Sequence, residues 1–220
     1  MLIEKKYKLF IEYFLEHQPN AETELKYENT FQLIIAVILS AQCTDKRVNL
    51  ITPDLFKRFP DPESLAKANI DEVFEYIKSC TYPNNKSKHL INMAKTLLEK
   101  FHGEIPNNVE DLMLLPGVGR KTANVVASVA YQIPAMPVDT HVFRVAARLG
   151  LSKNAKTPIQ TENQLVQNIP SHLLPLAHHW LILHGRYVCI ARKPKCEECK
   201  LKNICDHFRK VDEISDNFAF

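Results

Sequence analysis

Apolar residues recur every three or four positions along most of the chain, which is the spacing of one face of an α-helix. Segment 2–16 has such a face, and segment 87–101 repeats it in Leu90, Leu97 and Phe101. No segment alternates apolar and polar residues over a length typical of a strand. The pattern therefore predicts an all-α protein.

Capping residues, prolines and glycines set the limits of the predicted helices. Thr30 is expected to cap a helix over 31–41, which is apolar nearly all round and is therefore predicted to be buried. Pro53 is expected to separate two helices, and 82–85 is expected to be a turn. Other helices are expected over 2–16, 44–51, 53–59, 87–101, 109–115, 123–130, 139–149, 161–168 and 175–187, with short ones starting at Ser64 and Asp71. The last residues, 211–220, are expected to form a loosely held tail.

Two of the five glycines, Gly117 and Gly119, lie two positions apart between two segments of helical spacing. Glycine adopts positive φ and has no Cβ to block a ligand. A helix, a tight glycine turn and a second helix would direct backbone N–H groups outward, which makes an anion site suited to phosphate. An ordinary connection between two helices is the alternative.

Lys121 favours the ligand site over the ordinary connection. A cation in the first turn of a helix meets the positive end of the helix dipole, which destabilises it by roughly 0.3–1 kcal/mol. The same field favours the neutral amine, which is the form that a nucleophilic lysine needs.

Composition and charge narrow the class of protein. A chain of 220 residues that is 45% hydrophobic can bury a substantial core in one or two domains. It has no run of about 18 apolar residues and no signal sequence at its start, which predicts a cytoplasmic protein without a membrane partner. Segment 186–210 contains eight Lys or Arg and three acidic residues, a net charge of +5, which leaves −2 for the rest of a chain of net charge +3. Such a basic patch suits a phosphate backbone, and a solvated charged face is the alternative.

Four of the six cysteines lie within 17 residues near the C-terminus. They are Cys189, Cys196, Cys199 and Cys205. The CxxC spacing favours a metal over a disulfide in a cytoplasmic chain, and both zinc and a [4Fe–4S] cluster accept four thiolates. Structural zinc sites usually pair two CxxC motifs, whereas one is present here, so the spacing favours iron–sulfur. Cys43 and Cys80 stand alone in the sequence and are expected to be small buried hydrophobic residues.

Asp139 is a third candidate for a functional role. It follows Pro137 and precedes a predicted helix, so it is expected to be an N-cap. A carboxylate beside a reacting centre can also stabilise a developing cation or carry a proton, and the two roles do not exclude each other.

These elements together resemble the endonuclease III family, the bifunctional DNA glycosylase/AP lyases of the helix-hairpin-helix superfamily. The resemblance covers the chain from about residue 31 to residue 205. It rests on the spacing of the four cysteines and on Leu-Ser-Ala-Gln at 39–42, Leu-Pro-Gly-Val-Gly-Arg-Lys-Thr-Ala at 115–123, Val-Asp-Thr-His-Val-Phe-Arg at 138–144 and His-Trp-Leu-Ile-Leu-His-Gly at 179–185.

The resemblance implies an all-α, two-lobed helix-hairpin-helix glycosylase fold with a DNA-binding cleft between the lobes. One lobe would be a six-helix barrel over 23–134. The other would join 1–22 to 135–220 and carry a [4Fe–4S] cluster held by the four clustered cysteines. The implied partner is double-stranded DNA that contains oxidised pyrimidines or abasic sites, bound by a monomer in the cytoplasm, on the nucleoid of a prokaryote.

The resemblance also implies a mechanism in which the damaged nucleotide is flipped out of the duplex. Lys121 matches the family's nucleophile, whose neutral amine attacks C1′ and expels the base. The resulting Schiff base acidifies the C2′ proton, and β-elimination then cuts the strand 3′ to the lesion. Asp139 matches the essential carboxylate, which stabilises positive charge on the sugar and assists proton transfer. Burial and the helix N-terminus are expected to keep the Lys121 amine neutral.

The remaining implied residues contact DNA. Gln42 matches the residue that fills the gap left by the flipped nucleotide, and Gly117 and Gly119 form the hairpin. Arg192, Lys193 and Lys195 lie between the first two clustered cysteines, in a loop that contacts phosphates in the family.

Tyr82 departs from the family's pattern, which has Gly-Leu-Tyr-Asn where this chain has Thr81-Tyr82-Pro83-Asn84. Tyr82 would replace a leucine that wedges into the duplex, and Pro83 is expected to bias it toward an extended backbone. The alternative is a tyrosine that anchors the turn on the core. The departure leaves the lesion preference and the handling of the opposite base open.

Two other functions are compatible with parts of this pattern. An adenine glycosylase of the same superfamily would share the hairpin and the cluster but would lack a lysine at position 121. A non-catalytic helix-hairpin-helix DNA-binding protein, with a structural metal site held by the four clustered cysteines, would need neither Lys121 nor Asp139.

Overall fold

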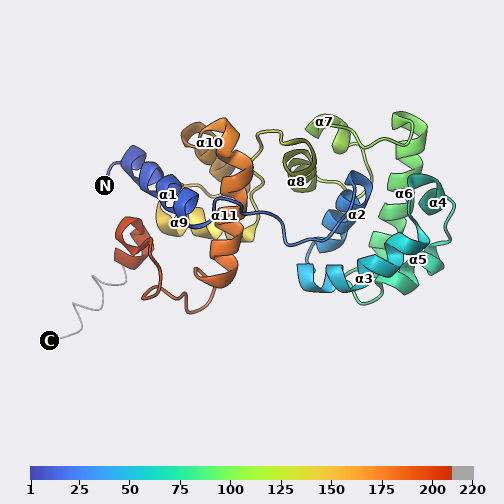
Figure 1. Ribbon diagram of the computed structural model, residues 1–220, viewed down its shortest axis with the longest axis horizontal. Helices are drawn as coiled ribbons and strands as arrows, with labels where there is room; N and C mark the ends of the chain where they lie inside the picture. The colour runs from blue at the N-terminus through green and yellow to red at the C-terminus, as the bar shows by residue number, and fades with distance from the viewer. Residues whose placement is uncertain (210–220) are drawn as a thin grey trace. The chain divides into compact units, whose positions relative to one another are not determined.

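The computed structural model describes residues 1–209, and its regular elements are helices (Figure 1). The helices are α1 (Ile3–His17), α2 (Thr30–Ser40), α3 (Asp45–Arg58), α4 (Pro62–Ala66), α5 (Ile70–Ile77), α6 (Pro83–Phe101), α7 (Val109–Leu112), α8 (Arg120–Tyr131), α9 (Thr140–Leu149), α10 (Pro158–Asn168) and α11 (Leu174–Tyr187), with short 3-10 helices η1 (Ser171–Leu173) and η2 (Lys202–Ile204). No strand occurs in residues 1–209, which confirms the predicted all-α class. The tail expected over 211–220 lies outside the described residues.

The chain divides into two compact units, each with its own hydrophobic core. The first unit combines Met1–Glu22 with the chain from Pro134 onward, and the second unit is Thr23–Ile133. None of the helices in the described part of the chain is long and apolar enough to cross a membrane.

Helix α2 lies in the middle of the core of the second unit. Leu33, Ile34 and Leu39 on this helix are fully buried, because α3, α6 and α8 all pack against it. An apolar helix surrounded on several sides is what the sequence predicts for this segment. Its cap differs from the prediction, however: Asn29, not Thr30, accepts a hydrogen bond from the Gln32 amide (2.9 Å).

The predicted break at Pro53 is wrong, because α3 continues through it. A proline inside a helix removes one backbone hydrogen bond and normally destabilises the helix. Val48, Thr52 and Leu55 are nevertheless all buried on one face of α3, and the Thr52 hydroxyl donates to the Val48 carbonyl (3.0 Å). Burial of this face outweighs the bond lost at Pro53.

Several helices begin earlier than the sequence predicts, among them α4, α5, α6 and α10. Their first residues follow the caps Asp61 (α4), Asn69 (α5), Tyr82 (α6) and Thr157 (α10). Proline occupies the first turn of three of these helices, where its missing N–H has no helical partner to lose. The turn expected over 82–85 is therefore wrong in part, because Pro83 starts α6 in the structure.

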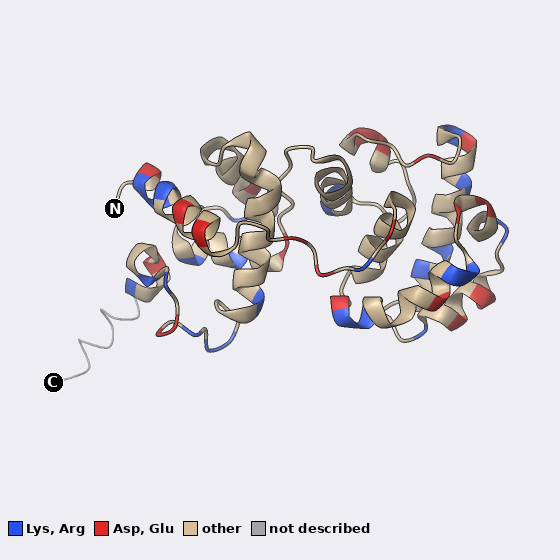
Figure 2. Cartoon of the chain, in the orientation of Figure 1, with Lys and Arg blue, Asp and Glu red and all other residues tan. Residues whose placement is uncertain are grey.

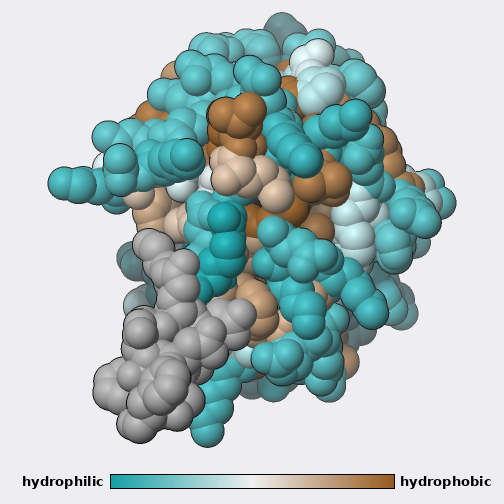
Figure 3. All heavy atoms as spheres, turned by 90° about the vertical axis from the view of Figure 1, so that its left-hand side faces the viewer, coloured by the Kyte–Doolittle hydropathy of each residue, from teal (hydrophilic) through white to brown (hydrophobic). Residues whose placement is uncertain are grey.

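Aromatic residues of α1 join the N-terminal segment to the rest of the first unit. Phe14 stacks on Trp180 of α11 (centroids 5.4 Å apart), and Phe10 meets the same ring edge-on (6.0 Å). The buried Lys6 amine donates to the Leu149 carbonyl (2.8 Å) and pairs with Asp206 (2.7 Å). The surface of this unit on the side of α1 is mostly hydrophilic, with hydrophobic residues in small groups (Figure 3).

Helices α9 and α11 of the first unit approach each other closely. A Cβ added at Gly185 would lie 2.9 Å from the His141 Cβ, so the contact requires glycine at this position. Because α9 carries Asp139 at its start and α11 leads into the clustered cysteines, this packing fixes two candidate functional segments within one unit.

Candidate functional site

The turn between α7 and α8 is a tight hairpin whose two glycines have different roles. Gly117 has φ +84°, and a Cβ there would lie 2.9 Å from the His89 Cβ, so both its backbone and its surroundings require glycine. Gly119 has φ −89° and no atom within 4 Å of an added Cβ. Positive φ therefore occurs at Gly117 and not at Gly119. Neither the backbone conformation nor packing within the chain explains why position 119 is glycine.

Lys121 is the second residue of α8, as predicted, and its side chain is exposed. The preceding N-cap, Gly119, has no side chain with which to satisfy the amides of the first turn, and the first helical bond runs from the Ala123 amide to the Gly119 carbonyl (2.9 Å). Such a helix start presents N–H groups to an anion. The predicted burial of Lys121 is wrong, because the buried face of α8 is the one with Ala123 and Val126.

Asp139 is the N-cap of α9, which confirms the structural part of its prediction. Its Oδ1 accepts from the His141 amide (2.8 Å) and the Val142 amide (2.9 Å). The side chain is half-buried, and the hydrogen bonds fix the position of the carboxylate at the helix start. Its catalytic role stays a prediction.

Gln42 and Tyr82 lie on two turns that contact each other. Gln42 is exposed at the end of α2, Tyr82 precedes α6 with 62% of its surface exposed, and the Thr81 hydroxyl donates to the Gln42 carbonyl (2.9 Å). The structure therefore joins two turns whose residues Gln42 and Tyr82 are 40 positions apart in the sequence. High exposure of the Tyr82 ring opposes the alternative in which it anchors the turn on the core.

The backbone of Tyr82 differs from the prediction. Its φ of 54° and ψ of 49° are left-handed, whereas a residue before proline is expected to be extended. Gln42 is also left-handed, with φ 56°. Non-glycine residues in this region store about 1–3 kcal/mol of strain, which surrounding contacts must hold in place.

Lys86 supplies much of that support, and sequence reasoning missed it. Its buried amine donates to the carbonyls of Leu39 and Ala41 (both 2.8 Å) and to the Thr81 hydroxyl (3.2 Å). The amine therefore binds carbonyls at the C-terminal end of α2, which favours a cation. Burial lowers the pKa of Lys86. The available signal was its position four residues before Leu90, on the apolar face of α6.

Cys43 and Cys80 stand alone in the sequence but lie close together in the structure. Their sulfur atoms lie 3.5 Å apart beside the same pair of turns, and neither cysteine is in a disulfide. Cys80 is buried as predicted, whereas Cys43 is only half-buried. No sequence spacing could pair them, because 37 positions separate them.

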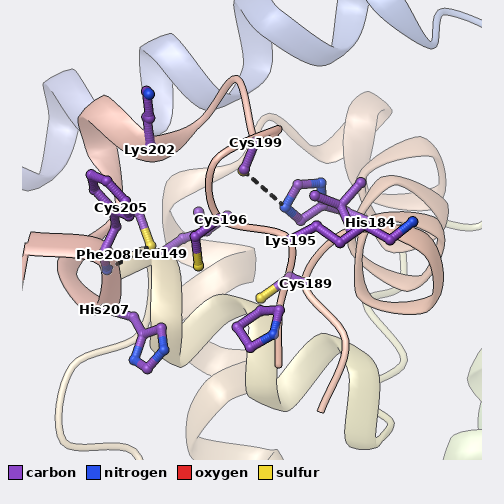
Figure 4. Close-up of a pocket in the computed structure, with 12 residues that line it drawn as sticks. Leu149, His184, Cys189, Lys195, Cys196, Cys199, Lys202, Cys205, His207 and Phe208 are labelled. Carbon is purple, nitrogen blue, oxygen red and sulfur yellow. Dashed lines mark hydrogen bonds between the residues drawn. The ribbon is translucent and has the colours of Figure 1, made fainter. Parts of the chain in front are cut away.

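The other four cysteines line a single pocket in the first unit, together with His184 (Figure 4). The Cys199 sulfur lies 3.7 Å from His184 Nε2. Burial lowers the pKa of His184 to about 4, so its ring is neutral. In residues 1–209, no three His, Cys, Asp or Glu side chains are arranged to hold a single metal ion. The four cysteines line one pocket together.

The chemistry of these thiols fits an iron–sulfur cluster. Burial and the neighbouring thiolates raise the pKa of Cys199, of Cys196 and, with Asp206, of Cys205. Four thiolates in one pocket therefore require a positive partner, and the iron of a cluster supplies it. The guanidinium of Arg148, 3.5 Å from the Cys189 sulfur, adds a permanent positive charge.

Two arginines of α9 hold the loop between the first two clustered cysteines, and sequence reasoning missed this role. Arg148 donates to the carbonyls of Ile190 (2.8 Å) and Ala191 (2.9 Å). Arg144 donates to the carbonyls of Gly185 (2.9 Å) and Cys189 (3.2 Å). Motif reasoning noted Arg144 without a function. The available signal was an arginine next to the apolar face of the helix, followed by a second arginine one turn later.

The same loop presents its own basic residues to solvent. Arg192, Lys193 and Lys195 are exposed, and Figure 2 shows Lys and Arg along the segment that follows α11. Lys193 has φ 53°, so the loop contains a left-handed residue within its exposed stretch. The predicted basic surface is therefore present, and its contact with DNA stays a prediction.

Two segments of the chain match models of known protein families. Residues 35–171 match the family model described as HhH-GPD superfamily base excision DNA repair protein, and residues 189–205 match the iron-sulfur binding domain of endonuclease III. The second match covers all four clustered cysteines and agrees with the [4Fe–4S] cofactor predicted for them.

Similar proteins span almost the whole chain. Endonuclease III of Rickettsia conorii is 49% identical over 91% of this chain and 95% of the relative, and that of Escherichia coli is 43% identical over 90% and 93%. A solved structure described as a trapped endonuclease III–DNA covalent intermediate has a TM-score of 0.91 at 39% identity, covering 96% of this chain and 100% of its own. A thermostable thymine-DNA glycosylase, at 24% identity and a TM-score of 0.83, shares the fold. The chain therefore belongs to the endonuclease III family of the HhH-GPD superfamily of base excision DNA repair proteins.

Proposed function

We propose that the chain, as a monomer, removes oxidised pyrimidines from double-stranded DNA and cleaves the resulting abasic site by β-elimination through an imine on Lys121. One observation carries the proposal: Lys121 is an exposed amine in the first turn of α8, two residues after a glycine with open space at its Cβ position. An endonuclease III of the same fold at 39% identity has been trapped as a covalent intermediate with DNA, which supports a covalent route.

Lys121 acts as the nucleophile in this proposal. Its neutral amine attacks C1′ of the damaged nucleotide, the base leaves with the electron pair of the glycosidic bond and takes up a proton, and the amine loses a proton. The nitrogen lone pair then forms the imine as the C1′–O4′ bond breaks, so the sugar ring opens and O4′ takes up a proton. The resulting imine withdraws electrons from C2′, so loss of the C2′ proton expels the 3′ phosphate.

Asp139 acts as the fixed carboxylate. Two backbone amides hold its Oδ1, so the group does not need to reorganise when positive charge develops on the sugar. A carboxylate at this position can also accept and return protons during base loss and imine formation.

Other exposed residues of the two units hold the DNA. Backbone amides at Gly119 and the start of α8 bind a phosphate, and Gln42 and Tyr82 enter the duplex together from the paired turns. The basic residues Arg192 and Lys193 bind further phosphates. The four clustered cysteines would hold the cluster, whose iron would balance the negative charge of their thiolates. The bound cluster would also fix the fold of the loop between Cys189 and Cys196. No cysteine lies in the hairpin.

A strand-cleavage assay on defined duplexes tests the substrate class. Duplex oligonucleotides with thymine glycol, dihydrouracil or an abasic site are expected to yield the β-elimination product, and an undamaged duplex is not. Cleavage of the abasic duplex alone would contradict the glycosylase part of the proposal. Binding without any cleavage would favour the non-catalytic DNA-binding alternative.

A further inference from the structure

The two cysteines outside the cluster form a pair at a sensitive place in the second unit. Cys43 directly follows Gln42, and Cys80 is two residues before Tyr82. Their sulfur atoms are 3.5 Å apart, and the Thr81 hydroxyl joins the same two turns through the Gln42 carbonyl. A bond between the sulfurs would therefore link the two turns covalently.

We propose that Cys43 and Cys80 form a reversible disulfide by exchange with a low-molecular-weight disulfide, and that this cross-link restrains the turns that carry Gln42 and Tyr82. The first part stands on the geometry alone. The second part rests on the proposed function, in which both side chains enter the duplex.

The geometry requires only a small movement. A disulfide has a sulfur–sulfur distance of about 2 Å, so the two atoms must approach by about 1.5 Å. Cys43 lies in the connection between α2 and α3, and Cys80 lies in the connection between α5 and α6. Neither residue is inside a helix, so rotation of the side chains and adjustment of short connections can close the gap.

The different burial of the two thiols sets the order of the exchange. Cys43 is half-buried and reachable, whereas only 5% of the surface of Cys80 is exposed. Burial and the contact with Cys43 raise the pKa of Cys80 to about 12, so it stays a thiol at neutral pH. The nearby charges of Lys86 and Arg47 favour its thiolate once a reaction begins.

The exchange proceeds in two balanced steps. The Cys43 thiolate attacks one sulfur of the small disulfide and expels one thiolate, which takes up a proton. The sulfur of Cys80 then attacks the mixed disulfide at the Cys43 sulfur, releases its own proton and expels the second small thiol. One small disulfide is reduced to two thiols, and the two cysteines are oxidised to one disulfide.

The disulfide would add a covalent bond between the two turns, and it would therefore hold the turns more rigidly. Insertion of two side chains into a base stack requires the turns to adjust to the DNA, and a covalent bond between the turns restricts that adjustment. Oxidation is therefore expected to slow base excision from duplex DNA severalfold more than cleavage of a single-stranded abasic site.

The experiment exposes the cluster-loaded protein to oxidised glutathione, while the cluster absorbance confirms that the iron–sulfur site stays intact. Peptide mapping without reductant is expected to find a peptide linked through Cys43 and Cys80, and dithiothreitol is expected to release it. The oxidised protein should also melt several degrees higher, since the bond constrains the unfolded chain. The variants Cys43→Ser and Cys80→Ser serve as matched controls and should show neither change.

Two outcomes would overturn the inference. Glutathione that remains on Cys43, or two thiols that stay free, would contradict the disulfide. A linked peptide with an unchanged ratio of duplex to single-strand activity would contradict the restraint on the turns. If the reduced protein excises no base at all, the proposed function fails, whereas the peptide map still decides whether the disulfide forms.

Discussion

The two glycines of the hairpin, Gly117 and Gly119, have different roles, and their local geometry distinguishes them. Gly117 and Gly119 are equivalent in the sequence motif, yet the structure requires glycine for its own sake only at position 117. The sequence could identify both glycines as special, because glycine is rare in this chain. It could not separate them, because the difference depends on φ and on His89, which comes from a distant helix.

The two glycines should respond differently to alanine. Gly117→Ala combines a left-handed backbone with a close contact to His89, and we expect it to lower the free energy of unfolding by about 2–3 kcal/mol. Gly119→Ala changes a helix cap with open space around it, so the loss of stability should stay below about 1 kcal/mol. Denaturant unfolding measures both, and a binding assay should find weaker DNA affinity for Gly119→Ala. Equal stability losses would contradict the distinction.

Tyr82 should matter for duplex DNA and not for single strands. Its exposed ring can stack on a base, which is worth ~1–3 kcal/mol in single-strand binders. We expect Tyr82→Ala to weaken binding to a duplex abasic site and to slow base excision. The same variant should keep most of its lyase activity on a single-stranded abasic oligonucleotide, where there is no stack to enter.

The control for this prediction is Tyr27→Ala, a partly exposed tyrosine of the same unit that carries no proposed contact with DNA. If Tyr82→Ala lowers duplex and single-strand activities by the same factor, Tyr82 serves the fold and its insertion into DNA is refuted.

At the scale of elements, apolar periodicity was sufficient to predict most helices, and their ends were predicted less well. Asn29, Asp61 and Asn69 cap helices that the sequence suggested would start elsewhere, because several consecutive polar residues can each act as a cap. The continuous α3 and the support of the two turns by Lys86 both depend on burial against other helices. Such tertiary contacts leave at most a weak signal in the sequence, such as the position of Lys86 on the apolar face of α6.

The loop between Cys189 and Cys196 should raise the affinity for DNA without making binding depend on the DNA sequence. Arg192→Ala with Lys193→Ala removes two possible phosphate contacts from a loop whose backbone Arg148 still holds. The slope of log K against log salt is then expected to fall by up to about 1.8, at roughly 0.9 for each phosphate contact. The double variant Lys153→Ala and Lys156→Ala, also exposed, is the charge-matched control. An unchanged slope and affinity would place the DNA on another surface.

At the scale of the whole molecule, the chain combines two units with separate cores and separate chemistry. Lys121, the proposed nucleophile, lies in the unit Thr23–Ile133, and Asp139 and the four clustered cysteines lie in the other. Motif spacing was sufficient to predict the cofactor and the family, because both depend on short segments. The contacts of Arg144, Arg148 and His184 around the cluster could not be predicted, because they join α9 and α11 to the cysteine loop.

Loss of the cluster should affect the fold of its own unit first. Metal analysis of the native protein is expected to find iron and no stoichiometric zinc, and Cys199→Ala should lose the iron, the associated visible absorbance and several degrees of thermal stability. Cys43→Ala is the matched control and should keep the iron. One zinc per chain without iron would contradict the assignment.

Borohydride trapping tests the central claim most directly, because reduction converts an imine between protein and DNA into a stable bond. With a damaged duplex, the native protein is expected to give a covalent adduct, and digestion should locate it on Lys121. Lys121→Ala should give none, whereas Lys95→Ala, which replaces another exposed lysine of the same unit, should give the native yield. An adduct of undiminished yield in Lys121→Ala would contradict the account.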